Sequence, residues 1–181
     1  MKFKRSGLLI VAAVATGIAA PAAFASDGTI TFNGKITATT CQISGNGGGS
    51  SFDVNLDEVS STALPTDKAT AAPRGFTIAL SNCTPASGNA AVYFEPGATV
   101  DTTTGQLLNV NGTATNVELG LLNGDSSVIK LGQNSDTQNV KWASISSGAA
   151  TFQYYAQYVA KGGAATAGSV KSSVTYSVIY Q

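Results

Sequence analysis

The sequence contains no histidine and little charge. Its 181 residues include ten Lys or Arg, ten Asp or Glu, two Cys, one Met and one Trp. Without histidine there is no imidazole for a general base, a metal site or a Ser-His-Asp triad. The adjacent carboxylates Asp57 and Glu58 would point to opposite faces of a strand, which does not suit a shared acid–base site. We therefore expect no enzymatic activity.

Signals for cofactors are equally scarce. The glycine-rich run 45–50 lacks the Gly-Lys-Ser/Thr ending that a phosphate-binding loop needs, so it is interpreted as a flexible loop. The other acidic residues are dispersed without calcium-loop spacing. No cofactor, metal or small-molecule substrate is predicted. The dispersed acidic residues are Asp101, Glu118, Asp125 and Asp136.

The only long apolar run lies at the N-terminus. Lys2, Lys4 and Arg5 precede the apolar stretch 8–18, and Ala23-Phe24-Ala25 fits an A-x-A cleavage site. We interpret residues 1–25 as a signal peptide that is cleaved before Ser26. The mature chain would then hold seven basic and ten acidic residues with no basic stripe, which argues against nucleic acid or an anionic membrane surface as a partner.

Two cysteines remain in this exported chain. An oxidising compartment makes a disulfide between Cys41 and Cys83 the default expectation. On the chain-entropy model, closing this loop would stabilise the fold by about 4 kcal/mol. A reactive thiol pair is the alternative, although neither cysteine lies in a C-x-x-C motif.

Both ends of the mature chain alternate between apolar and polar residues. In the stretch 28–36, Ile30, Phe32, Gly34 and Ile36 fall on one face of an extended strand. The chain closes on a second such strand, with its apolar face formed by Val174, Tyr176, Val178 and Tyr180.

The stretches between the two ends also predict strands. Phe52, Val54 and Leu56 alternate with polar residues, 60–73 is expected to be a long connection, and Asn123-Gly124-Asp125 signals a hairpin. Short strands, frequent turn residues and no convincing amphipathic helix indicate an all-β sandwich. The further expected strands are 38–43, 74–83, 90–94, 117–121, 128–131, 140–145 and 152–160.

These features, taken in order, resemble the pilins of the chaperone–usher pathway, and in particular the major subunit of type 1 fimbriae. The resemblance covers essentially the whole mature chain and depends on the ordered set of its features. The matching pieces are 28–36 leading to Cys41, Phe76 to Cys83, Ala114-Thr115-Asn116-Val117, Ala156-Gln157-Tyr158, Gly168 and the penultimate Tyr180.

The resemblance implies an incomplete immunoglobulin-like sandwich that lacks its last strand. The stretch 26–36 would be an N-terminal donor-strand extension, and 37–181 the pilin domain. A periplasmic chaperone and then the extension of the next subunit would fill the vacant groove, at an outer-membrane usher. Ile30, Phe32, Gly34 and Ile36 would be the donor residues. The groove and chaperone-recognition strand would contain Gly168, Val174, Tyr176, Val178 and Tyr180.

The implied function is that of a structural subunit of a bacterial surface fimbria, joined head-to-tail with other subunits and supporting adhesion. A minor or adaptor pilin is an alternative within the same pathway. A second alternative is a monomeric secreted carbohydrate-binding sandwich that uses Tyr154, Tyr155 and Tyr158, with 28–36 as its own first strand.

Overall fold

The computed structural model describes residues 28–34 and 36–181. The chain separates into two units, residues 1–35 and residues 36–181. In the described residues, no helix is long and apolar enough to cross a membrane. The predicted signal peptide and its cleavage site lie outside the described residues.

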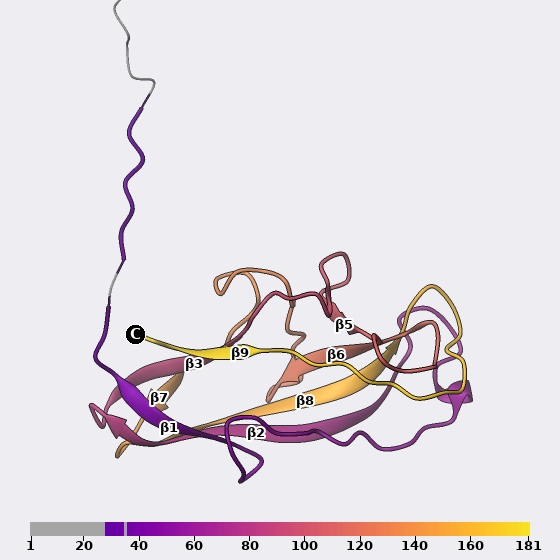
Figure 1. The fold of residues 1–181 in the computed structure, drawn as a ribbon, viewed down its shortest axis with the longest axis horizontal. Coiled ribbons are helices and arrows are strands. Elements are labelled where there is room, and N and C mark those ends of the chain that lie inside the picture. The colour runs from indigo at the N-terminus through magenta and orange to yellow at the C-terminus, as the bar shows by residue number, and fades with distance from the viewer. Residues whose placement is uncertain (1–27, 35) are drawn as a thin grey trace, which may run out of the picture. The chain divides into compact units, whose positions relative to one another are not determined.

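The second unit is all-β and contains two antiparallel sheets (Figure 1). The larger sheet has the strand order β1-β2-β8-β6-β5-β4, so the two longest strands, β2 and β8, pair near its centre. Figure 1 shows β8 running between β2 and β6. The strands of this sheet are β1 (Thr40–Gly45), β2 (Thr70–Thr84), β4 (Val100–Asp101), β5 (Gln106–Leu108), β6 (Val117–Asn123) and β8 (Ala150–Ala160).

The smaller sheet has three strands in the order β7-β3-β9. They are β7 (Ala143–Ile145), β3 (Gly88–Phe94) and β9 (Tyr176–Tyr180), and β3 pairs with both neighbours. In the part of the chain that the structure describes, β9 is therefore an edge strand, which pairs with β3 along one edge and with no strand along the other. A single 3-10 turn, η1 (Ser61–Ala63), completes the described elements.

The core lies where the inner faces of the two sheets meet. From β2, Phe76, Ile78 and Leu80 are buried, as their alternation predicts. The Tyr154 ring on β8 packs against the rings of Phe76 and Phe94, at centroid distances of 5.5 and 5.3 Å. Such aromatic contacts add stabilisation beyond the buried area alone.

The disulfide prediction is confirmed. Cys41 on β1 is bonded to Cys83 on β2, and no described cysteine is free. The bond ties the edge strand of the larger sheet to its neighbour beside a register shift between Thr40 and Gln42. It thereby fixes the first strand of the second unit where the chain enters the fold.

Some predicted strands are absent. The stretch 52–56 keeps its predicted alternation of burial but forms no strand, because no neighbouring backbone pairs with it. The return strand 128–131 is reduced to one isolated bridge between Leu122 and Val128. The expected connection 60–73 ends early, since β2 begins at Thr70.

The described residues 28–34 also form no strand. The alternating sequence is present, but an extended segment counts as a strand only when a second backbone completes its hydrogen-bond ladder. The large apolar side chains of this segment are exposed: Ile30 is 79% and Phe32 is 89% exposed. Ile36, the first residue of the second unit, is fully exposed.

Candidate functional site

A long groove of about 1150 Å³ opens along the second unit. One side is the extended stretch 50–58, called here the first lip. The other is the stretch 169–176, called the second lip, which leads into β9. The floor is apolar and comes from the larger sheet together with Phe94, and it includes Phe76, Ile78, Leu107, Leu119, Leu121, Ala156 and Tyr158.

The two lips run antiparallel to each other. At one end of the groove, the Tyr176 hydroxyl donates a hydrogen bond to the backbone oxygen of Ser50, at 2.6 Å. At the other end, Glu58 and Gly168 line one pocket. Residue 50 therefore lies beside residue 176, and residue 58 lies near residue 168.

The second lip presents an unpaired backbone edge to the groove. The carbonyl oxygens of Ser169, Lys171 and Thr175 accept hydrogen bonds from the backbone N–H groups of Ala114, Val110 and Glu95. These partners belong to the segments that follow β3 and β5 and precede β6. Because backbone groups alternate along an extended chain, those of the even-numbered residues face the opposite side, towards the groove. In the described residues, no strand pairs with that side.

The first lip has the same character. Phe52, Val54 and Leu56 pack against the core, while Asp53 and Asn55 are exposed. No backbone–backbone hydrogen bond involves residues 51–59 within the described part of the chain. Two neighbouring extended segments with free backbone groups, above an apolar floor, can accept one further strand between them.

Glycines allow the lips to lie close to the rest of the domain. A Cβ atom at Gly45 would lie 1.9 Å from the Phe52 ring, and one at Gly112 would lie 2.2 Å from the Ser169 carbonyl oxygen. A Cβ atom at Gly168 would lie 2.5 Å from the Ala114 nitrogen. These close approaches hold the first lip against β1 and the start of the second lip against the segment before β6.

A smaller pocket of about 360 Å³ lies at the Glu58 end of the groove. Tyr158, Ser169 and Val170 line both this pocket and the groove, so the two are continuous. Most of the remaining apolar lining comes from a second buried cluster of small and aliphatic side chains. The pocket is lined in part by Leu64, Ala114, Val117 and Ala165.

Charge is concentrated at the same end of the groove. The Asp57 carboxylate accepts a hydrogen bond from Arg74 at 3.3 Å, with both side chains more than half exposed. Glu58 is exposed and has no ion-pair partner among the described residues. Burial raises the pKa of Tyr158 on the groove floor, and the negative charges of Asp57 and Glu58 raise that pKa further.

The C-terminal strand lies within the stretch that the sequence predicts, but it begins at Tyr176, after Val174. β9 spans Tyr176–Tyr180, and Val174, Tyr176, Val178 and Tyr180 are all half-buried against the core. Burial raises the pKa values of Tyr176 and Tyr180. Gly168 lies directly before the second lip, in contact distance of Ala114.

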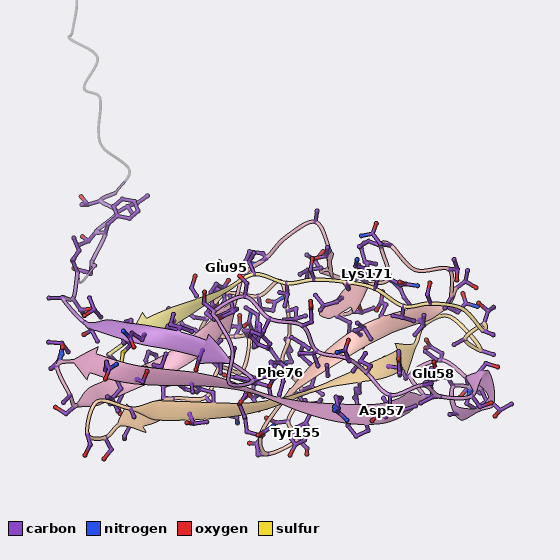
Figure 2. All side chains as sticks on the ribbon, turned by 60° about the horizontal axis from the view of Figure 1, so that its bottom comes forward. Asp57, Glu58, Phe76, Glu95, Tyr155 and Lys171 are labelled. Carbon is purple, nitrogen blue, oxygen red and sulfur yellow. A yellow bond between two sulfur atoms is a disulfide. The ribbon has the colours of Figure 1, made fainter. Side chains whose placement is uncertain are left out.

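The three tyrosines considered for sugar stacking do not form an exposed row. Tyr154 is 2% exposed and belongs to the core, and burial raises its pKa beyond the normal range. Tyr158 lies on the floor of the groove, and Tyr155 lies on the other face of β8, as Figure 2 shows. The alternation along β8 places Tyr155 on the opposite face from Tyr154 and Tyr158.

The sequence did not identify three features of this domain. The first lip was expected to be an ordinary strand, although its alternation correctly predicted which side chains turn inward. The ion cluster of Lys161, Asp101 and Glu118 was also missed, because sequence separations of 60 and 43 residues carry no local signal. Gln138, fully buried and bonded to both backbone groups of Phe94, was missed for the same reason.

Comparison with known proteins points to one family. The family model described as FimA, type-1 fimbrial protein A, matches residues 56–181. The chain is 48% identical over 169 residues to the major fimbrial subunit SMF-1 of Stenotrophomonas maltophilia, covering 90% of this chain and 98% of that protein. It is 42% identical over 166 residues to the F17 fimbrial protein of Escherichia coli, covering 88% of this chain and 91% of that protein.

A solved structure agrees on the fold. The crystal structure of an antigen and type I fimbria protein of Burkholderia pseudomallei aligns with a TM-score of 0.55 and 21% identity, covering 79% of this chain and all of that one. The family model matches most of the chain, and the relatives are similar over nearly their whole length. This protein therefore belongs to the FimA family of type-1 fimbrial proteins and is a non-enzymatic structural subunit of a surface fimbria.

Proposed function

We propose that this subunit polymerises by donating residues 26–36 of one copy to the groove of the next. Strand addition to an open sheet edge is an established mode of peptide recognition, and pilin donor-strand complementation is an example of it. The observation that carries the proposal is the groove itself: an apolar channel of about 1150 Å³ between two lips with unpaired backbone. On this view, residues 37–181 form an immunoglobulin-like sandwich that lacks its last strand.

The extension has the chemistry that the groove requires. Ile30 and Phe32 are highly exposed, and Ile36 is fully exposed. Burying each of these side chains would contribute about 1.5 to 3 kcal/mol, and a backbone ladder with both lips would fix the register. Gly34 would leave room where the extension passes over the floor.

The terminal pocket favours one orientation of the extension. If Ile36 lies at the Glu58 end, an aliphatic side chain fills the pocket beside Leu64 and Ala114. In the reverse orientation Gly28 would take that place and leave the pocket empty. The first orientation buries more apolar surface, so we expect the extension to run parallel to the first lip and antiparallel to the second.

The open edge of β9 also accounts for the other proposed partners. An exposed edge beside Val178 and Tyr180 is prone to aggregation until a strand covers it. A periplasmic chaperone would cover it first, and the outer-membrane usher would be the place where the next subunit replaces the chaperone. Residues 1–25 would direct export and be removed beforehand.

The test is the variant Phe32→Asp, which places a carboxylate in the apolar groove. Burying an unpaired charge is very unfavourable, so we expect the loss of fibres while the subunit still accumulates with its chaperone. Thr31→Asp is the matched control, because residue 31 lies on the other face of the extension. Normal fibres from Phe32→Asp, seen by electron microscopy and on SDS-resistant ladders, would refute the donor role.

A further inference from the structure

We propose that Asn33-Gly34 is a site of spontaneous deamidation at which an unassembled subunit loses its ability to donate the extension, and that insertion into the next copy protects the site. The modification itself is independent of the proposed function. Its consequence and the protection rest on the donor role. The co-reactant is water, and no enzyme is required.

The chemistry follows from the pair of residues. Glycine has no side chain that would keep its backbone nitrogen away from a preceding asparagine. The Gly34 nitrogen attacks the side-chain amide carbon of Asn33, a C–N bond closes a cyclic imide, and the side-chain nitrogen leaves as ammonia with the proton of the Gly34 N–H. Water then opens the imide at one of its two carbonyls. One opening gives aspartate, and the other gives isoaspartate, whose main chain runs through the former side-chain carbon.

The sequence contains four Asn-Gly pairs, and two of them are held through the asparagine. Asn123 is 1% exposed, and its side-chain nitrogen donates hydrogen bonds to the Ser127 hydroxyl at 3.1 Å and the Asn139 carbonyl at 2.9 Å. The side-chain oxygen of Asn46 accepts from the Thr77 N–H at 2.9 Å, and the Asn46 N–H donates to the Thr77 carbonyl at 3.0 Å. A side chain fixed in this way cannot turn freely to meet the nitrogen that follows it.

A third pair is held through its glycine. Gly112 lies so close to the second lip that a Cβ atom there would be 2.2 Å from the Ser169 carbonyl oxygen. The N–H of Asn111 donates to the Lys171 carbonyl at 3.5 Å. The peptide unit between Asn111 and Gly112 therefore has little freedom to rotate.

The fourth pair, Asn33-Gly34, has none of these restraints. Both residues are exposed, and no hydrogen bond to the described residues 28–34 and 36–181 involves either of them. Nothing lies within 4 Å of a Cβ atom placed at Gly34. The backbone here can adopt the bent geometry that ring closure needs, so we expect this pair to react first.

Insertion into the groove would remove that freedom. A strand between the two lips has its backbone groups paired on both sides, and this pairing keeps the chain extended. Closing the imide would require the Gly34 nitrogen to leave its place in the ladder and turn towards the Asn33 side chain. The reaction should therefore be slow in assembled copies and faster in free ones.

The isoaspartate product would disable the donor. It lengthens the main chain by one carbon between Phe32 and Ile36, so the alternation that puts both side chains on one face is lost. The aspartate product keeps the alternation and adds only a charge on the outward face. We therefore expect the first product to block insertion and the second to be tolerated.

The experiment incubates the dilute, oxidised mature chain and preassembled filaments side by side in mildly alkaline buffer. Peptide mass mapping locates deamidation, and enzymatic methylation measures isoaspartate. Isoaspartate should appear at position 33 of the dilute chain ahead of the other three pairs, with little in the filaments. When assembly is then started by raising the concentration, light scattering should show a loss of assembly in proportion to the isoaspartate at position 33. Circular dichroism checks that the incubated domain stays folded.

Two variants serve as controls. Asn33→Gln should keep its assembly after the same incubation, because its longer side chain closes the corresponding ring much more slowly. Freshly prepared Asn33→Asp carries the charge without the longer backbone and should assemble like the wild type.

Three results would overturn the proposal. Modification of any other Asn-Gly pair before Asn33 would remove the site. Normal assembly of a chain that carries isoaspartate at position 33 would remove its consequence, and equal modification in filaments and dilute chain would remove the protection. Failure of the donor role shows separately, as normal fibres from Phe32→Asp, and would overturn the consequence and the protection even if Asn33 still reacts first in the dilute chain.

Discussion

At the scale of single residues, the groove depends on positions where a side chain is missing. Gly168 is the clearest case, because its φ is +156° and a Cβ atom there would lie 2.5 Å from the Ala114 nitrogen and 2.7 Å from the Thr113 hydroxyl. The nearest atoms belong to backbone or to a side chain that already bonds Ser169. The start of the second lip therefore has little freedom to move aside.

We expect Gly168→Ala to shift the second lip and destabilise the domain by about 1 to 3 kcal/mol, through strain and a lost close approach. Denaturant unfolding of the oxidised chain measures this change. Gly97→Ala is the matched control, since nothing lies within 4 Å of a Cβ atom at Gly97. Equal stability of the two variants would contradict the importance of this contact.

At the scale of elements, local alternation predicted the faces of strands well. Phe76, Ile78 and Leu80 are buried as their spacing predicts, and Val54 turns inward even without a ladder. Alternation cannot predict whether a neighbouring backbone completes the hydrogen bonds. The stretches 52–56 and 128–131 alternate as strands do, and they were predicted as strands although neither forms one in the fold. Pairing is a property of the fold, whereas periodicity is a property of the segment.

Ion pairs between elements escaped prediction for a related reason. Lys161, at the end of β8, donates hydrogen bonds to Asp101 on β4 and, at 2.7 Å, to Glu118 on β6. Thr104 donates to the other oxygen of Glu118, which is 2% exposed. The cluster joins three strands of the larger sheet. The hydrogen bond from Lys161 holds the pKa of Asp101 far below its ordinary value, with help from the Thr103 N–H.

The cluster predicts a pH dependence of stability. A lowered pKa in the folded state means that Asp101 contributes its full stabilisation above its unfolded pKa of 3.8 and loses it as the pH falls further. The pKa of Lys161 is raised by the same bonds, so its contribution is complete below 10.5 and lost only above that value. Asp101→Asn should therefore lower the melting temperature at pH 7.

Below pH 3.8 the difference between Asp101→Asn and the wild type should narrow. Asp125 complicates the wild-type curve, because bonds from Ser127 and the charge of Lys141 lower its pKa to about 2. Since Asp125 is present in both proteins, its contribution cancels from the difference between their melting temperatures. A gap in melting temperature that stayed constant from pH 7 to pH 2 would mean that Asp101 acts through packing and not through charge.

At the scale of the whole molecule, one copy would carry both halves of the joint, a donor extension and an acceptor groove. Insertion of each extension into the next groove is a head-to-tail contact that need not close on itself, so it generates an open filament. The fold could be predicted as all-β from periodicity and composition. The groove could not be located from the residues alone, because its lips come from stretches more than 100 residues apart and their unpaired backbone has no sequence signature.

This arrangement predicts that a chain with a groove and a defective donor ends a growing filament. Phe32→Asp alters the extension and leaves every groove residue unchanged. Mixed at one variant per about twenty wild-type chains, it should therefore shorten filaments to about twenty subunits without lowering the amount of folded protein. Filament lengths measured by electron microscopy test this, with Thr31→Asp as the control. If the mixed filaments kept wild-type length, the variant would not occupy filament ends, and the joint would have to form through a surface other than the extension.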